Sequence, residues 1–375
     1  RGREHNPNIL TSQHSFLENP SLESLRDEID RIDEQVVSLL NERVQAAVEI
    51  GRIKDKLGVD PYDPAREEQV FDKLQSINEG PMQGDSLRTI YREVISASIA
   101  LEKELVIGYL GPEATYTHQA AAKNFGTALT YRPLPDIPDV FQAVEQGECD
   151  YGVVPIENST EGAVNRSLDL LVDTELRIVA QVYLKVEHCL FSESSMSEIQ
   201  EVRSKDQALA QCGDWLRRNL PQARLVPVSS TAEAVRECKT SQGSAAIAGK
   251  LAGGIHDVPL QEEGIQDRKN NTTRFLVVAR NSLPRREGVD YRTSLVISLS
   301  DQVGALQNAL KPFSGRDLNL CKIESRPSGK KTWDYYFFVD FIGHLEDEKV
   351  VEAMKELEGG SPFVKHLGSY PETSL

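Results

Sequence analysis

The chain has 375 residues, enough for two or three domains with separate cores. Its formal net charge of -16 and pI near 5.0 repel polyphosphate, and its lysines and arginines are scattered, so we expect no nucleic acid as a partner. No apolar run approaches the ~18 residues of a membrane span, and no segment resembles a signal peptide. We therefore expect a cytoplasmic protein with no membrane partner.

Cysteines and histidines give no sign of a disulfide framework or a metal site. The five cysteines are odd in number and widely separated, which is typical of reduced packing residues. The seven histidines show neither H-x-H nor H-E-x-x-H spacing. We expect no metal and no cofactor.

The first predicted element is a very long helix. Residues 1–19 are polar and aperiodic, and we interpret them as a disordered arm or an expression remnant. From Leu22 onward, apolar residues recur at spacings of three and four; Asn19 and Pro20 suit the cap and first turn, and Gly58 suits the end. Such a helix of ~35 residues is ~50 Å long, more than a small domain can cover with its own chain.

Two shorter helices complete an all-helical region that we place at residues 20–104. One spans residues 64–78 with Asp63 as N-cap, and the other spans residues 85–103. Three helices with one overlong member indicate a bundle that is completed by a second subunit.

Basic residues of the long helix offer a possible anion site. Arg43 and Lys54 are eleven residues apart, about three turns, and so share a helix face, whereas Arg26 is rotated away by about 100°. Basic side chains that face a bundle interior require an anion or an acid as partner. Solvated surface charges are the alternative interpretation.

Five short segments of this region resemble the all-helical chorismate mutase family: residues 25–30, 41–43, 51–54, 63–67 and 95–102. The resemblance implies that Arg26 reaches into the pocket of a partner subunit. It also implies that Arg43 and Lys54 bind the two carboxylates and the ether oxygen of chorismate.

The same resemblance implies that Asp63, Arg66 and Glu67 close the site and that Ser98 and Glu102, four residues apart on one helix face, complete it. Glu102 stands where a Gln is frequent in the family. A Glu donates a hydrogen bond only when protonated, so we expect the mutase activity to fall as the pH rises through its pKa. Asp63 has the alternative role of a helix cap alone.

The pattern changes near Lys103 to alternating strands and helices, which predicts an α/β domain at residues 105–283. Thr115 and Ser230 or Thr231 stand at predicted helix starts, where free backbone N–H groups can bind an anion. The glycines do not form G-x-G-x-x-G, so we expect no dinucleotide.

Residues 267–275 form a polar stretch that runs directly into the apolar strand 275–279. Its amides, hydroxyls and guanidinium suit the capture of a small, oxygen-rich anion. A solvated loop before a strand is the alternative.

Residues 111–118, 152–159 and 271–275 resemble the three hallmark segments of the prephenate dehydratase family, and the similarity runs from about 106 to 283. The resemblance implies two α/β lobes, like a small periplasmic binding protein, with prephenate in the cleft between them. Thr273 would donate to the departing hydroxyl, and Arg274 and Phe275 would lie around it.

Other residues of these segments complete the expected dehydratase site. Asn158, Ser159 and Thr160 would face Thr273 across the cleft, with Thr115 on the rim. His118 and His188 are alternative proton donors, but we expect a helix-packing role for the former and a strand-edge role for the latter.

The last region, residues 284–375, is predicted to be ferredoxin-like. Strands at 293–299, 319–325, 333–341 and 364–370 and helices at 303–311 and 348–357 give the order βαββαβ. Residues 301–306 and 324–327 resemble the two signatures of the ACT regulatory domain. The resemblance implies a phenylalanine site, and a plain turn is the alternative. The expected ligands are Gly304, Ala305, Leu306, Glu324, Ser325, Arg326 and Pro327.

Together the three resemblances imply a bifunctional enzyme that converts chorismate to prephenate and then to phenylpyruvate, with feedback inhibition by phenylalanine. We expect a homodimer or a dimer of dimers. One alternative is an amino-acid or keto-acid sensor that only binds its ligand. Others are a dehydratase whose helices serve only for dimerisation, and a dehydratase that acts on arogenate.

Overall fold

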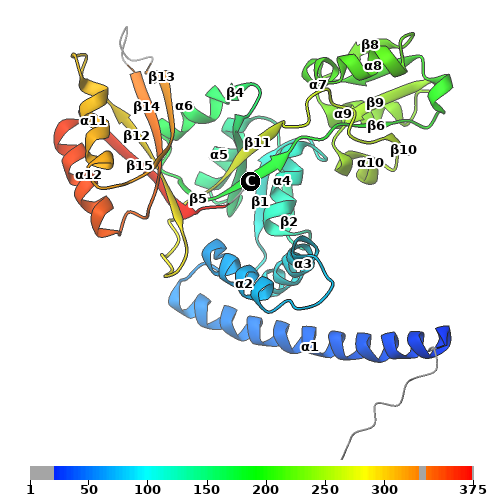
Figure 1. The fold of residues 1–375 in the computed structure, drawn as a ribbon, viewed down its shortest axis with the longest axis horizontal. Coiled ribbons are helices and arrows are strands. Elements are labelled where there is room, and N and C mark those ends of the chain that lie inside the picture. The colour runs from blue at the N-terminus through cyan, green and yellow to red at the C-terminus, as the bar shows by residue number, and fades with distance from the viewer. Residues whose placement is uncertain (1–20, 329–334, 374–375) are drawn as a thin grey trace, which may run out of the picture.

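The computed structural model describes residues 21–328 and 335–373. Figure 1 shows a helical arm beside the first lobe of a two-lobed α/β unit, and a smaller α+β unit on the side of the first lobe opposite the second lobe. The predicted arm at 1–19, the cap residues Asn19 and Pro20, and the start of the strand predicted at 333–341 lie outside the described residues.

The helical arm consists of α1 (Leu22–Leu57), α2 (Pro64–Ser76) and α3 (Gly84–Glu102). Ser21 caps α1 by accepting a hydrogen bond from the backbone N–H of Ser24, and Gly58 ends it in the left-handed conformation, with φ of 66°. The predicted long helix is confirmed. α1 has no buried residue in the single chain, because α2 and α3 cover only part of its length (Figure 1).

The first α/β lobe is built on a six-stranded sheet with the order β2-β1-β3-β11-β5, in which β4 pairs with β3. The strands are β1 (Val106–Leu110), β2 (Thr130–Leu134), β3 (Tyr151–Asn158), β4 (Gly162–Ala163), β5 (Arg177–Lys185) and β11 (Thr272–Ala279). The helices are α4 (Tyr116–Phe125), α5 (Ile137–Glu145) and α6 (Asn165–Asp173). β11 is antiparallel to both of its neighbours, because the chain returns to this sheet after building the second lobe.

The second lobe is inserted between β5 and β11 and has a five-stranded sheet with the order β10-β6-β9-β7-β8. The strands are β6 (Cys189–Phe191), β7 (Glu201–Ser204), β8 (Arg224–Pro227), β9 (Ser244–Ala248) and β10 (Leu260–Glu262). The helices are η1 (Met196–Glu198), α7 (Asp206–Gln211), α8 (Gly213–Asn219), α9 (Thr231–Cys238) and α10 (Lys250–His256). α7 and α8 meet at Cys212, whose φ of -112° departs from helical geometry.

The C-terminal unit confirms the predicted βαββαβ order. It contains β12 (Tyr291–Ser298), α11 (Ala305–Ser314), β13 (Leu320–Pro327), β14 (Tyr335–Ile342), α12 (Glu348–Gly360) and β15 (Phe363–Pro371). All strand pairs are antiparallel in the order β13-β14-β12-β15, so β13 is an edge strand. Both helices pack on one face of this sheet, around Phe313 and Phe341.

The other face of the C-terminal sheet packs on the first lobe. Tyr370 and Leu367 of β15 share one buried cluster with Val154 of β3 and Leu276 of β11. Closest approach occurs at Gly368, where an added Cβ would lie 2.1 Å from the carbonyl oxygen of Ile178. Glycine is therefore required for β15 to approach the backbone of β5.

The helical arm joins the first lobe through buried aromatic residues. Tyr62 accepts a hydrogen bond from the side chain of Asn124 (2.8 Å), and Tyr151 donates one to Asp60 (2.7 Å). Within 21–328 and 335–373, no helix is both long and apolar enough to cross a membrane.

Replacing Gly368 by Ala should destabilise the fold by about 1–3 kcal/mol, because the new methyl group meets backbone that cannot rotate away. Gly359→Ala on α12 is the matched control, since no atom lies within 4 Å of the added Cβ. Thermal unfolding of both variants checks this. Equal midpoints would contradict the close approach of β15 and β5.

Candidate active sites

A cavity of about 290 Å³ lies between α1, α2 and α3. It brings together seven of the eight residues predicted for the mutase site: Arg43, Lys54, Asp63, Arg66, Glu67, Ser98 and Glu102. The eighth, Arg26, is exposed on α1 and does not line the cavity. Its predicted role in the pocket of a partner subunit stays a prediction.

Basic groups line the α1 side of this cavity. The guanidinium of Arg43 donates to Ser98 Oγ (3.1 Å), and Lys54 Nζ donates to the carbonyl oxygen of Pro61 (2.8 Å). These contacts hold the two cations in place but use only part of their donor capacity. The cavity therefore suits an anionic ligand.

Glu102, a half-buried residue, contributes a carboxyl group to the same cavity. Its Oε2 has no hydrogen-bond partner in the part of the chain that the structure describes. Burial raises the pKa of Glu102 above its usual 4.5, and the positive charge of Lys54 opposes the shift. A raised pKa favours the protonated form, which can donate a hydrogen bond.

Asp63 has more than one role. Its Oδ1 accepts from the backbone N–H of Arg66 (3.0 Å), which confirms the predicted helix cap. Its Oδ2 accepts from Nε of Arg286 (2.7 Å), a residue of the segment between β11 and β12. Asp63 thus joins the mutase-like cavity to the segment that precedes the C-terminal unit.

Glu67 is paired with Arg92 of α3 inside the arm. Burial raises the pKa of Glu67, and the charge and hydrogen bond of Arg92 oppose that shift. The resemblance to known mutases implied a contact of Glu67 with a substrate hydroxyl. In the structure, Arg92 pairs with this carboxylate and holds it in place.

A second cavity, of about 510 Å³, lies between the two α/β lobes. Four of the residues predicted for the dehydratase site line it: Thr115, Asn158, Thr273 and Phe275. Ser230 and Thr231, noted in the sequence as a helix start, line it from the second lobe, and Ser230 caps α9. Thr115 likewise caps α4.

Thr273 and Asn158 are paired across β11 and β3. Asn158 Oδ1 accepts from Thr160 N–H (2.9 Å), which fixes the orientation of the amide. Its Nδ2 then donates to Thr273 Oγ1 (2.8 Å). Because Thr273 accepts this bond, its own O–H proton is available to a group in the cleft.

Three predicted residues lie elsewhere. Ser159 is exposed and bonds to the main chain at the start of β11, accepting from Thr272 N–H (2.9 Å). Thr160 lines a neighbouring hollow and bonds to Asn158. Arg274 is on the opposite face of β11 from Thr273 and donates to Asp340 (2.7 Å), so the structure does not support its expected contact with substrate.

His188, which the sequence offered as an alternative proton donor but for which a strand-edge role was expected, directly precedes β6 and lines the cleft. It bonds to Tyr116 (2.8 Å) and through Nε2 to Gln211 (2.7 Å). Burial lowers the pKa of His188, and the hydrogen bond with Gln211 opposes the shift. Lys205 adds a positive charge from the second lobe. These residues lie far from the hallmark segments in sequence, and only the closure of two lobes brings them together.

His118 packs as expected. Its ring stacks on Tyr109 with centroids 4.6 Å apart, and Nδ1 accepts from Ala114 N–H (3.1 Å). Burial lowers the pKa of His118, opposed by the charge of Glu113. Among the residues that the structure describes, no group of three or more His, Cys, Asp and Glu side chains could hold a metal ion.

The residues predicted for phenylalanine fall on two elements of the C-terminal unit. Gly304 precedes α11 with φ of 83°, a conformation that favours glycine, and Ala305 and Leu306 begin the helix. Residues 324–327 lie on the edge strand β13. Arg326 of that strand donates twice to the carboxylate of Asp169 on α6 (2.7 and 2.8 Å).

Comparison with known proteins assigns all three regions. The chorismate mutase type II family matches residues 25–103, the prephenate dehydratase family residues 107–283, and the ACT domain residues 293–359. The chain is 43% identical over 359 residues to a bifunctional chorismate mutase/prephenate dehydratase of Aquifex aeolicus (strain VF5), covering 94% of this chain and 99% of that protein. The chain belongs to this family.

Other relatives agree. A protein of the same description from Neisseria gonorrhoeae (strain ATCC 700825 / FA 1090) is 43% identical over 354 residues, 93% of this chain and 97% of that one. The crystal structure of a prephenate dehydratase from Arthrobacter aurescens in complex with L-Phe superposes with a TM-score of 0.66 at 34% identity. The match covers 72% of this chain and 90% of that one.

Replacing Arg92 by Met should destabilise the protein by about 3 kcal/mol near neutral pH, because it leaves the buried Glu67 carboxylate unpaired. Burial raises the pKa of Glu67, so the loss should shrink as the pH falls and the carboxyl takes up a proton. Arg88→Met is the control, since its pair with Glu68 is more exposed. Chemical unfolding at several pH values measures both; a loss independent of pH would contradict the role assigned to Glu67.

Proposed function

We propose that the helical cavity converts chorismate to prephenate and that the interlobe cleft converts prephenate to phenylpyruvate, with phenylalanine as inhibitor through the ACT domain. The convergence of seven predicted side chains in one cavity is the observation that carries the mutase assignment. We assign the mutase activity to residues 20–104, the dehydratase activity to residues 105–283 and the inhibition by phenylalanine to residues 284–375. The cytoplasmic location and the lack of nucleic-acid or membrane partners stay predictions.

The mutase step needs no nucleophile, because it is a pericyclic rearrangement of one molecule. Cations that hold both carboxylates keep chorismate in its reactive conformation, and donors stabilise the charge that develops on the ether oxygen. We assign carboxylate binding to Arg43 and Arg66 and donation to the ether oxygen to Lys54 and protonated Glu102. Ser98, Asp63 and Glu67 hold these groups or contact the substrate hydroxyl.

The exposed apolar face of α1 indicates that a second subunit packs on the helical arm. The apolar residues of α1 remain exposed, among them Leu25 (42%), Ile29 (55%) and Val36 (45%). A second copy of α1 would cover this apolar face and could bring its Arg26 to the cavity. We therefore propose a homodimer, or a dimer of dimers, as the working form.

The dehydratase step removes a carboxylate as carbon dioxide and a hydroxyl as water, and it produces an aromatic ring. The ring supplies much of the driving force, so the protein must mainly assist the departing oxygen. Thr273 would donate a hydrogen bond from its O–H to that oxygen, while the amide of Asn158 donates to Thr273 Oγ1 and holds it in place. Lys205 and the N–H groups at the start of α9 suit a substrate carboxylate.

Purified protein given chorismate alone should form phenylpyruvate, followed by proton NMR, and phenylalanine should slow the reaction. Thr273→Ala should accumulate prephenate with dehydratase turnover reduced about 10²-fold or more, because the donor hydroxyl is lost. Thr273→Ser, which keeps the hydroxyl, is the matched control. Unreacted chorismate in the wild type would favour a ligand sensor, and full turnover by Thr273→Ala would exclude the role given to this residue.

The mutase kcat/KM should decrease as the pH rises through the pKa of Glu102, which burial raises above 4.5, because only the protonated carboxyl donates to the ether oxygen. Glu102→Gln donates at every pH and should abolish this decrease. Initial rates from pH 5 to 9 test the pair, with dehydratase rates as the internal control. Identical profiles for wild type and variant would refute the assignment.

A further inference from the structure

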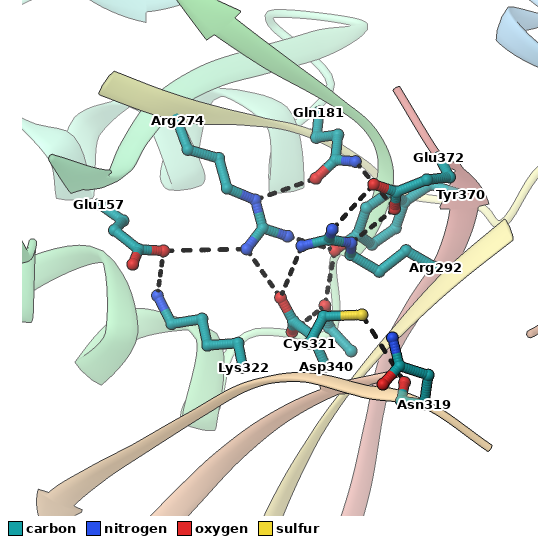
Figure 2. A network of polar contacts seen from close by, with 11 residues as sticks. Glu157, Gln181, Arg274, Arg292, Asn319, Cys321, Lys322, Asp340, Tyr370 and Glu372 are labelled. Atoms are coloured by element: carbon teal, nitrogen blue, oxygen red, sulfur yellow. Dashed lines mark hydrogen bonds and ion pairs between the residues drawn. The ribbon is translucent and has the colours of Figure 1, made fainter. Parts of the chain in front are cut away.

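The register of β3 and β11 divides four neighbouring residues between two faces of the sheet. Thr273 pairs with Asn158, and the next pair along is Arg274 with Glu157. Successive side chains of a strand point to opposite faces. The first pair therefore faces the cleft, and the second faces the C-terminal unit, as Figure 2 shows for Glu157 and Arg274.

A matching pair of the C-terminal sheet meets these two residues. Lys322 of β13 is the register partner of Asp340 of β14. Lys322 Nζ lies 2.6 Å from Glu157 Oε2, and Arg274 Nη1 lies 2.7 Å from Asp340 Oδ2. Arg274 and Glu157 are themselves 3.9 Å apart. We call these four charged residues the interface quartet.

Most of the quartet is buried, and its hydrogen bonds hold Arg274 in one orientation. The side chains of Arg274, Asp340 and Lys322 are only 6%, 8% and 11% exposed. Arg274 uses the rest of its planar fork as well, donating from Nε to Gln181 (2.9 Å) and from Nη2 to Tyr370 (2.8 Å). A guanidinium held on three sides cannot shift without leaving a buried charge unpaired, which is costly.

One member of the quartet, Lys322, lies on β13, the strand that also carries residues 324–327 of the expected effector site. Residues 324–327 follow Lys322 on β13, and Arg326, on the same face as Lys322, binds Asp169 of the first lobe. A ligand that displaces β13 must therefore either move Glu157 with it or break the contact between Lys322 and Glu157. Glu157 is adjacent in the chain to Asn158.

We propose that the interface quartet positions the Thr273–Asn158 pair, and that the C-terminal unit controls the dehydratase through it. Glu157 and Arg274 are positioning residues, and Lys322 and Asp340 hold them. An effector that binds one arrangement of β13 more tightly than another then shifts the catalytic pair between two arrangements. This inference rests on the proposed function and adds the physical route by which one domain acts on the other.

Lys322→Met is the sharpest test, because Glu157 is 39% exposed and can be solvated when its partner is lost, so the fold should survive. Lys365→Met on β15 is the matched control. It removes the same charge from the same interface, at a site where Nζ donates to the carbonyl oxygen of Val172 (2.8 Å) and not to the quartet. Lys322→Arg should restore the contact.

Lys322→Met should lower the dehydratase kcat and raise the phenylalanine concentration for half-inhibition, each by about 3- to 30-fold, the range typical of coupling residues. KM for prephenate and the mutase rate should stay within about twofold, since neither site is contacted. Lys365→Met should match the wild type, and Lys322→Arg should recover both dehydratase properties.

Equal kcat and equal phenylalanine inhibition in Lys322→Met and Lys365→Met would overturn the inference and leave the proposed function intact. A wild-type protein without dehydratase turnover would instead refute the proposed function itself. Thermal midpoints of the three variants separate the two roles: a merely structural contact would lower the midpoint of Lys322→Met without changing the inhibition.

Discussion

Strand β11 has to satisfy two different environments at once. At its start, side chains alternate between the interlobe cleft and the C-terminal sheet, so Thr273 and Arg274, adjacent in sequence, serve opposite faces. A one-residue slip of this strand would place the guanidinium in the cleft and the hydroxyl in the domain interface. The pairing of β11 with both β3 and β5 prevents that slip, and the catalytic geometry depends on it.

Much of the architecture could be predicted because it is encoded by local patterns. Spacings of three and four predicted α1, and its face periodicity placed Arg43 and Lys54 together in one cavity. Short strands such as β6 and β10 were not predicted, since three residues carry too little pattern. The split between α7 and α8 occurs at Cys212, directly before Gly213, and a single glycine within a helical pattern does not by itself predict a break.

The sites were predictable only where a motif carried them. Thr273 and Asn158 belong to hallmark segments, and the strand register then brings them together. Arg274 was expected in the cleft because all residues of the motif 271–275 were assigned to one site. Successive side chains of a strand point to opposite faces, so Thr273 and Arg274 cannot both face the cleft. Lys205 was not predicted and His188 was expected at a strand edge, because the place of both residues in the cleft depends on how the two lobes close. The bond of Arg286 to Asp63 joins residues more than two hundred positions apart, and no local pattern signals it.

The three functional regions are joined by charged contacts as well as by apolar packing, and the two kinds of contact differ in their physical consequences. An apolar surface gains free energy from burial with little dependence on the angle of contact, so two such surfaces can slide past one another. A paired buried charge is stable in one geometry and costly in others. The buried pair of Arg274 with Asp340 therefore fixes the C-terminal unit on β11, next to Thr273. The pairs of Arg286 with Asp63 and of Lys322 with Glu157, each half open to solvent, add weaker contacts next to the two active sites. A contact that is stable in only one geometry can hold two units in position and can also pass a displacement of one unit on to the other.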